Sequence, residues 1–247
     1  MNADLAQFIQ TSADKTLLQK YAPLLTVQMP RDNPCIRPTA GNLSRHQGFM
    51  NIATNQDFDV LFMGDSITDL WNVEADQQGN PGGKPIFDKY FASMKVANFG
   101  ISGDTTQGVL WRLQNGEGKG HKPKAVMLMI GTNNDGNASG AEIAEGIGAI
   151  VLELRNDFPD AKIMLLAIFP RGAGPSDSNR HKNEEANKII AKLDDQKHVF
   201  FTNINSKFLD ENGGLVGFRT SDHLHPVTQG FEIWASTVAP TLNGWLN

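Results

Sequence analysis

Cysteine is nearly absent from this sequence, because Cys35 is the single cysteine among 247 residues. One cysteine excludes an intramolecular disulfide, and no Cys/His spacing of the zinc-finger kind occurs. The fold must therefore be held by the packing of its side chains.

An excess of positive charge is also missing. The formal net charge is -5, and the 22 lysines and arginines are scattered along the chain rather than clustered. Proteins that bind nucleic acid usually present a basic face. We therefore expect no nucleic-acid partner.

Long apolar runs are absent as well. The longest, such as residues 125–130 and 163–169, fall far short of the roughly 20 residues that span a bilayer, so we expect no membrane helix. The first twenty residues lack the basic start and the apolar core of a secretory signal. A cytoplasmic location is the simplest interpretation, although a mature periplasmic or secreted chain would look the same. The sequence leaves open whether the chain forms a homo-oligomer.

The length and composition are typical of one folded domain. Hydrophobic residues make up 40% and charged residues 20% of the 247 positions, which suits a globular protein with one sizeable core. Residues 3–22 carry apolar side chains at helical intervals, and a run rich in Pro, Arg and Asn follows as far as about Asn42. We predict a single domain over 1–247, with a helical or irregular N-terminal arm at about 1–55.

The pattern changes after Asn55 to short, nearly continuous apolar runs. Each is followed by Gly, Asn, Ser or Asp and then by a segment of helical length. Runs of this kind suit strands that are buried on both faces of a parallel sheet. The five runs are residues 59–65, 95–102, 125–132, 162–169 and 198–204. Their alternation with helices predicts an α/β fold: a three-layer αβα sandwich around a doubly wound, five-stranded parallel sheet of flavodoxin-like type.

Three helices have clear signals. Ser139 and Glu142 form the S-x-x-E pattern of a capping box, and the apolar stripe that follows ends before Pro159. Two more apolar stripes lie at 186–193 and 231–238. The Gly-rich residues 77–85 are interpreted as a surface connector between helices, with a loop over the site as the alternative.

Ser66 follows the first predicted strand directly. Ile67 to Leu70 can begin a helix, which would place the Ser66 hydroxyl and its own N–H at a helix N-terminus, a position suited to an anion. The alternative is that Ser66 is only the N-cap of that helix. The tetrapeptide GDSI at 64–67 does not by itself decide between the two.

Two further strand ends offer hydrogen-bond donors. Gly103, after the second strand, permits a turn that exposes a backbone N–H above the sheet. Asn133, after the third strand, can aim its amide at the same space. Ordinary turn chemistry also uses Gly and Asn, but it does not explain why three separate strand ends each carry a donor.

A possible general base lies near the C-terminus in the segment SDHLHP at 221–226. On a helical turn, Asp222 and His225 would share a face, so that the carboxylate binds one ring nitrogen and the other points at Ser66. The alternatives are a surface turn or a metal site that uses His223 and His225. A metal needs at least a third ligand, and the remaining histidines show no matching spacing. We therefore expect neither a metal nor a cofactor.

Taken together, GDSI, GISGD, GTNN and DHLH resemble the four sequence blocks of the SGNH (GDSL-type) hydrolases, over about residues 57–230. The longer stretches of sequence at 98–117 and 165–172 are similar to the branch that contains the platelet-activating-factor acetylhydrolase catalytic subunits and many bacterial acyl esterases. The first block has Ile67 where the name motif has leucine, a conservative change that leaves the serine unaffected.

The resemblance implies roles for the residues reached above. Ser66 would be the nucleophile, and Asp222 and His225 would complete the triad. The N–H of Ser66, the N–H of Gly103 and the amide of Asn133 would form the oxyanion hole.

The substrate class is less constrained. No loop supplies a contiguous apolar patch for long acyl chains. Trp71 and Trp111 could wall a small acyl pocket or stack on a sugar, with burial in the core as the alternative; Asp65 and Asn134 are further candidates for substrate binding. We expect a serine esterase for acetyl-type esters, with O-acetylated carbohydrate as its first candidate substrate. The alternatives are an acetylated ether phospholipid, small aryl esters, or a flavodoxin-like binding module without turnover.

Overall fold

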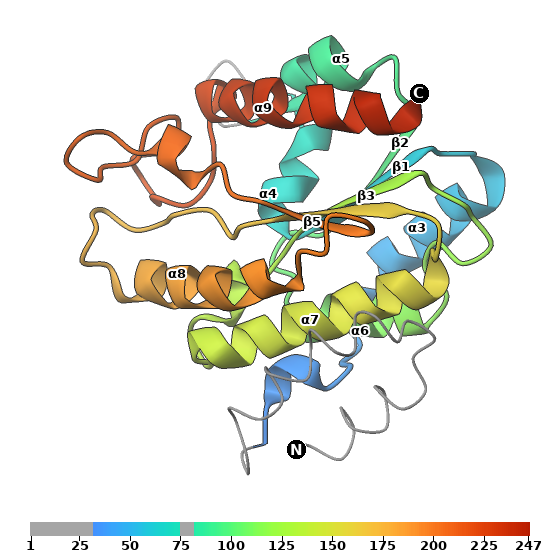
Figure 1. Cartoon of the computed structure of the whole chain (residues 1–247), viewed down its shortest axis with the longest axis horizontal. Helices are drawn as coiled ribbons and strands as arrows, with labels where there is room; N and C mark the ends of the chain where they lie inside the picture. Colours follow the sequence, from blue (N-terminus) through green and yellow to red (C-terminus); the bar gives the residue numbers. More distant parts are fainter. Residues whose placement is uncertain (1–31, 75–81) are drawn as a thin grey trace.

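The computed structural model describes residues 32–74 and 82–247 (Figure 1). Residues 1–31 of the predicted N-terminal arm, and residues 77–81 of the predicted connector, lie outside the described residues. Lys84 and Pro85, assigned to that connector, are instead the first residues of helix α5 (Lys84–Phe91). Proline is tolerated there because the first N–H groups of a helix have no partner within it.

Five parallel strands form one sheet in the order β2-β1-β3-β4-β5. The strands are β1 (Val60–Gly64), β2 (Val96–Gly100), β3 (Ala125–Met129), β4 (Lys162–Leu166) and β5 (Val199–Thr202). This order is the flavodoxin-like one, and it confirms the predicted fold class. All five predicted runs continue past the carboxyl ends of these strands, into the loops that follow them.

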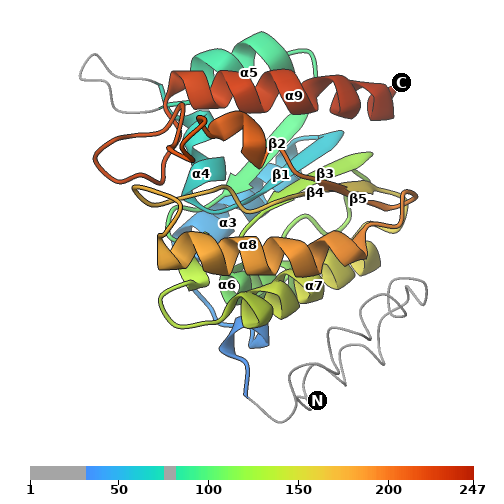
Figure 2. The same cartoon turned by 60° about the vertical axis from the view of Figure 1, so that its left-hand side comes forward.

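Helices cover both faces of the sheet and give the three layers. Figure 2 shows α5 and α9 above the sheet and α6, α7 and α8 below it. The helices not yet bounded are α3 (Leu43–Asn55), α4 (Ser66–Asp69), α6 (Thr106–Gln114), α7 (Gly140–Asp157), α8 (Ser178–Ile190) and α9 (Thr228–Leu246). Short 3-10 helices are η1 (Pro34–Ile36), η2 (Leu70–Asn72), η3 (Thr132–Asn134), η4 (Ala191–Leu193) and η5 (Asn205–Phe208).

Side chains of β1 alternate between two apolar cores, one on each face of the sheet. Val60 and Phe62 pack in one core, and Leu61 and Met63 pack in the other. All four are 0% exposed. A strand that buries both faces has no polar positions, which is why it appears in the sequence as a continuous apolar run.

The predicted capping box is present at the start of α7. The Ser139 hydroxyl accepts from the Glu142 N–H, and Glu142 accepts from the Ser139 N–H at 2.8 Å. The helix ends at Asp157, two residues before Pro159. Both other predicted helices are present, as α8 and α9, and both begin earlier than their apolar stripes indicate.

The described part of the N-terminal arm, residues 32–55, packs against the layer of helices below the sheet. Asn33 donates to the Glu142 carbonyl oxygen at 3.0 Å, and Thr106 donates to the Cys35 carbonyl oxygen at 2.9 Å. The thiol of Cys35 is buried beside the Asn134 amide. Helix α3 buries His46, Phe49 and Ala53, and the sequence did not indicate it as a separate element.

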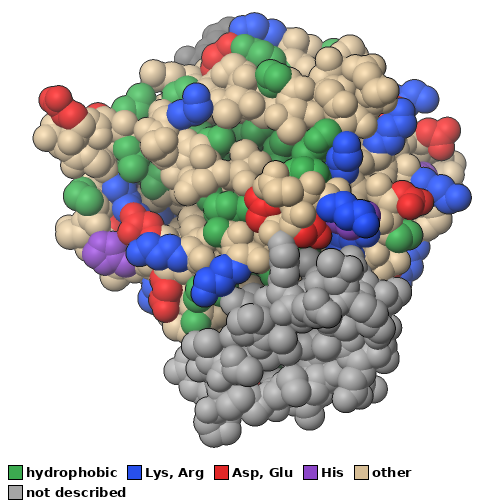
Figure 3. Space-filling view, in the orientation of Figure 1, with side chains coloured by type: hydrophobic (Ala, Val, Ile, Leu, Met, Phe, Trp, Pro, Cys, Tyr) green, Lys and Arg blue, Asp and Glu red, His purple; other side chains and the backbone are tan. Residues whose placement is uncertain are grey.

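The surface carries both signs of charge. On the face shown in Figure 3, Lys and Arg side chains are interspersed with Asp and Glu. None of the helices within 32–74 and 82–247 combines the length and the apolar character that crossing a membrane requires.

Candidate active site

The end of β1 gives Asp65 and Ser66 different tasks. Asp65 is the N-cap of α4, and its Oδ1 accepts from the Ile67 N–H at 3.0 Å. Ser66 is the first residue of the helix, so the alternative interpretation of Ser66 as the cap is wrong. With the cap supplied by Asp65, the Ser66 hydroxyl is free for another partner.

That partner is the imidazole of His225. Ser66 Oγ lies 2.9 Å from His225 Nε2, and His225 Nδ1 lies 2.9 Å from Asp222 Oδ2. A carboxylate only accepts, so Nδ1 must carry the proton and, in the neutral ring, Nε2 is left to accept from the Ser66 hydroxyl. The structure thus brings together three side chains that sequence analysis had placed in one site.

Asp222 and His225 are brought together by a turn and not by the expected helical turn. Asp222 Oδ1 accepts from the N–H groups of Leu224 at 2.9 Å and His225 at 3.1 Å. His223 within it has a φ of 49°, in the left-handed region that a helix does not use. The backbone of Arg219 donates to the His225 carbonyl oxygen at 2.9 Å, which closes the turn.

The turn favours the ionised form of Asp222. Partial burial raises its pKa, but hydrogen bonds from the His225 ring and from the N–H groups of His225 and Leu224 outweigh burial and hold the pKa below its ordinary value. The Arg219 guanidinium lies 3.7 Å from Asp222 Oδ2. A charged carboxylate is the form that stabilises a protonated imidazole.

The two further donors follow strands that flank β1. Gly103 comes after β2, is exposed and has a φ of 81°, which favours glycine. Asn133 comes after β3 within η3, and its Nδ2 donates to the Asp104 carbonyl oxygen at 2.8 Å. An amide carries two N–H groups, so this bond fixes the side chain and leaves one donor.

The other three candidates are buried. Asp65 is 1% exposed, and burial raises its pKa to about 7. Trp71 is 0% exposed, and its ring centre lies 4.5 Å from that of Phe231 and 4.9 Å from that of Trp234. Of the two interpretations of Trp71, the structure therefore agrees with burial in the core.

The side chain of Asn134 forms hydrogen bonds in the interior of the protein. Its Nδ2 donates to Thr106 Oγ1 at 3.1 Å and to Gln107 Oε1 at 2.8 Å, and its Oδ1 accepts from the Thr106 N–H at 3.0 Å. The side chain therefore joins η3 to the start of α6.

Sequence analysis missed two arginines beside the site. Arg171, after β4, donates to the carbonyl oxygen and the hydroxyl of Thr132 at 3.1 and 3.2 Å and pairs with Asp135. Arg112 in α6 donates its Nε to Asp104 Oδ2 at 3.0 Å. Both lie in segments that carry the family resemblance, which was the available signal.

A cavity of about 210 Å³ lies beside Gly103. Residues 39–42 form one wall, and residues 101–105 with Gln107 and Gly108 form the other. Its position next to a proposed oxyanion donor makes it a candidate for binding part of a substrate.

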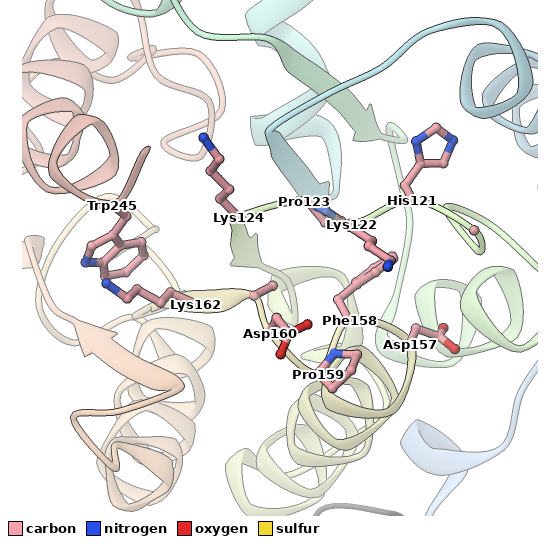
Figure 4. Close-up of a pocket in the computed structure, with 12 residues that line it drawn as sticks. His121, Lys122, Pro123, Lys124, Asp157, Phe158, Pro159, Asp160, Lys162 and Trp245 are labelled. Atoms are coloured by element: carbon pink, nitrogen blue, oxygen red, sulfur yellow. The ribbon is translucent and has the colours of Figure 1, made fainter. Parts of the chain in front are cut away.

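A larger cavity, of about 430 Å³, lies at the amino ends of the strands, on the side of the sheet opposite to Ser66 (Figure 4). It is lined by Lys124 and Lys162 at the starts of β3 and β4 and by Trp245 in α9. Ligands of doubly wound sheets bind at the carboxyl ends of the strands, and Ser66 does not line this cavity.

A metal site in a protein needs three or more ligands held close together. Within the described residues, no three His, Cys, Asp or Glu side chains are arranged to bind an ion. His223 and His225 therefore lack a third ligand there.

Known proteins are similar to this chain in sequence. The model of the GDSL-like lipase/acylhydrolase family matches residues 62–233. The platelet-activating factor acetylhydrolase IB subunit alpha2 of Rattus norvegicus is 36% identical over 190 residues, which cover 76% of this chain and 78% of that protein. The alpha1 subunit of Homo sapiens is 31% identical over 209 residues, covering 81% and 85%.

Solved structures have the same fold. A GDSL-like lipase from Bacteroides thetaiotaomicron gives a TM-score of 0.64 at 18% identity, covering 82% of this chain and 99% of that chain. An acetylxylan esterase from Geobacillus stearothermophilus gives 0.58 at 20% identity, covering 75% and 94%.

Proposed function

Because the chain belongs to the GDSL-like lipase/acylhydrolase family and is a carboxylic ester hydrolase, we propose that it is a serine esterase that removes acetyl and similarly short acyl groups. The supporting observation is the hydrogen-bonded series from Asp222 through His225 to Ser66, with both distances at 2.9 Å. A serine hydroxyl is a weak nucleophile at neutral pH, and an adjacent, oriented imidazole is what activates it.

The proposed reaction has two halves. His225 takes the hydroxyl proton as Ser66 Oγ attacks the ester carbonyl, and it returns a proton to the departing alcohol. A water molecule, activated by the same imidazole, then hydrolyses the acyl-serine and releases the acid. Asp222 holds the ring in the required tautomer and stabilises its charged form.

Negative charge on the former carbonyl oxygen would be bound by three donors. They are the N–H groups of Ser66 and Gly103 and the free amide N–H of Asn133, which follow the adjacent strands β1, β2 and β3. Removing one such donor costs about 10²–10³ in kcat in comparable enzymes.

A short acyl group fits what surrounds the site. Within residues 32–74 and 82–247, the large hydrophobic side chains with substantial exposure are Leu43 at 59% and Val73 at 42%. Two such side chains are too few to form the apolar surface with which an interfacial lipase contacts a lipid phase. The curated relatives are acetylhydrolases by name, which also favours acetyl.

The alcohol portion is proposed to be hydroxyl-rich, as in O-acetylated carbohydrate. Thr, Ser, Asn and Gln side chains line the cavity beside Gly103, together with Asp104, Ala40 and Ile101, and the described residues of its lining include no lysine or arginine. Uncharged donors and acceptors suit sugar hydroxyls, whereas a phosphate favours arginine or lysine.

An acetylated ether phospholipid is the second candidate. It is favoured by the names of the relatives, which are subunits of a platelet-activating factor acetylhydrolase.

Initial rates with p-nitrophenyl acetate, butyrate and octanoate, for wild type and Ser66→Ala, test the proposal. We expect the highest kcat/KM with acetate and near-complete loss of turnover in Ser66→Ala. Activity that survives the replacement, or that peaks with octanoate, contradicts it. Acetylated xylo-oligosaccharide compared with an acetylated ether phospholipid then separates the two substrate classes.

A further inference from the structure

A series of buried ionic side chains lies behind the loop that carries Gly103. Asp104, the next residue, accepts from Arg112 Nε at 3.0 Å, and Arg112 also pairs with Glu117. Glu117 Oε2 in turn lies 2.9 Å from His46 Nδ1. Arg112 is 1% and Glu117 0% exposed, so the series runs through the interior from α3 to the site.

Burying these charges is unfavourable in itself. Burial raises the pKa of Asp104 and of Glu117, and the charge of Arg112 opposes the rise in both. Apolar residues of similar volume would often give an equally stable or a more stable interior. The arrangement therefore calls for a role other than stability.

Asp104 connects the ionic series to both proposed donors beyond Ser66. Its backbone N–H donates to the Ile101 carbonyl oxygen at 3.0 Å, which closes a turn around Gly103. Its carbonyl oxygen accepts from Asn133 Nδ2 at 2.8 Å. Any shift of Asp104 would thus move the Gly103 N–H and release the Asn133 amide together.

We infer that Arg112 is a positioning residue, which fixes Asp104 and thereby the oxyanion donors Gly103 and Asn133. This inference rests on the proposed function, because the two donors have a catalytic task only in an acyl-transfer site. Arg112 itself acts through Asp104 and does not touch the reacting atoms.

The guanidinium group is suited to this role. Besides Asp104 and Glu117, it donates Nη1 to the Phe99 carbonyl oxygen at 3.1 Å, within β2. One planar group thus ties the loop to its own strand and to a second buried carboxylate. A lysine ammonium on its flexible stem does not reproduce this fixed geometry.

Gly108 provides a second, steric way to displace Asp104. A Cβ added to Gly108 would lie 2.0 Å from Asp104 Oδ1, and its three nearest atoms all belong to Asp104. Alanine is otherwise preferred over glycine within a helix, and Gly108 lies inside α6. Gly108→Ala therefore pushes on the carboxylate without removing any charge.

The experiment compares two test variants with two matched controls. The test variants are Arg112→Lys and Gly108→Ala. Arg155→Lys changes another buried arginine, 5% exposed and bonded to the carbonyl oxygens of Phe158 and Ala161. Gly244→Ala changes a helical glycine whose added Cβ would meet no described atom within 4 Å beyond the neighbouring residues of its own helix. Both controls lie away from Ser66, and we expect wild-type kinetics from them.

For p-nitrophenyl acetate we expect both test variants to lose roughly 10- to 100-fold in kcat, with KM changed by less than about twofold, because misplaced oxyanion donors affect the transition state. The loss caused by either variant should become much smaller in an Asn133→Ala background, since the two changes then act on the same interaction. Destabilisation without positioning would not produce this non-additivity.

The outcomes are distinct. A kcat within twofold of wild type in folded Gly108→Ala or Arg112→Lys, or losses that multiply with Asn133→Ala, overturn the inference. If Arg112→Lys fails to fold by circular dichroism, Gly108→Ala decides. A wild type that does not hydrolyse the ester, or activity that survives Ser66→Ala, would instead contradict the proposed function.

Discussion

At the scale of single residues, two neighbouring polar side chains at the end of β1 divide the work. Asp65 caps α4 from a buried position, with 1% of its surface exposed, and Ser66 keeps its hydroxyl for His225. The close fit of Gly64 supports this arrangement, because a Cβ there would lie 2.3 Å from both the Met129 carbonyl oxygen and Thr68 Oγ1. The strand therefore ends in a position from which the serine has little freedom to move.

Asp65 should make stability depend on pH. Burial raises its pKa from 3.8 to about 7, so between these values the folded protein holds a proton that the unfolded chain has lost. The free energy of unfolding then falls as pH rises through this window and levels off above about pH 7. Asp65→Asn keeps an oxygen acceptor for the Ile67 N–H and does not titrate.

We expect Asp65→Asn to flatten this slope and to gain stability over wild type at pH 8, by at most roughly 4 kcal/mol at about 1.4 kcal/mol per pKa unit. Urea unfolding at pH 5 and pH 8 measures the difference. Asp160→Asn, at an exposed position, serves as the control. A variant with the same slope as wild type would show that Asp65 is ionised in the folded state over the whole range.

At the scale of elements, the strands could be predicted because a strand that is buried on both faces gives a continuous run of apolar residues in the sequence. Helix α7 could be predicted because Ser139 and Glu142 give a local capping signal. Helix α3 could not, since few of its side chains are buried and its cap residue Asn42 makes no side-chain cap bond. The burial of Trp71 depends on α9, more than 150 residues further along the chain, and no local pattern reports it.

The turn that holds Asp222 and His225 was predicted in its contacts but not in its backbone. Spacing of three residues permits the carboxylate and the imidazole to meet in a helical turn or in this tighter turn. The left-handed conformation of His223 distinguishes them, and histidine gives no sequence signal for it.

Asp222→Asn should keep this turn and disable the base. An asparagine Oδ1 can still accept from the Leu224 and His225 N–H groups. Its amide nitrogen, however, would donate to Nδ1, move the ring proton to Nε2 and leave no acceptor for Ser66. We expect kcat for p-nitrophenyl acetate to fall by about 10³–10⁴, with a thermal midpoint near that of wild type.

Arg219→Gln is the matched control for the Asp222 experiment. The guanidinium of Arg219 lies 3.7 Å from the Asp222 carboxylate and is partly exposed. Because exposed ion pairs contribute little, we expect Arg219→Gln to change kcat by less than about threefold. Substantial turnover by Asp222→Asn would mean that the tautomer of His225 is set by another group.

At the scale of the whole molecule, the site draws on two parts of the chain. Residues 62–233, which match the family, include Ser66, Gly103, Asn133, Asp222 and His225. Residues 39–42 lie outside that match and form one wall of the cavity beside Gly103. The Thr39 N–H donates to the Gln107 carbonyl oxygen at 3.1 Å, which attaches this wall to α6.

Filling that cavity should alter selectivity and leave the chemistry intact. In Ala40→Phe the larger side chain would occupy space proposed for the alcohol. We expect kcat/KM for acetylated xylo-oligosaccharide to fall about tenfold or more, equivalent to about 1.4 kcal/mol of lost transition-state binding, with little change for p-nitrophenyl acetate.

Ala92→Phe, at an exposed position just after α5, controls for the added aromatic surface. Equal losses on both substrates in Ala40→Phe would place the cavity at the reacting centre, and no loss on either would remove it from substrate binding.

The shielded sulfur of Cys35 has a practical consequence. The residue is 1% exposed, and burial raises the pKa of its thiol to about 11, so little reactive thiolate forms near neutral pH. Maleimide dyes should therefore spare the native fold. A cysteine engineered into the rim at residues 39–42 would become the sole labelling point, and a fluorophore attached there would report directly on occupancy of the neighbouring hollow.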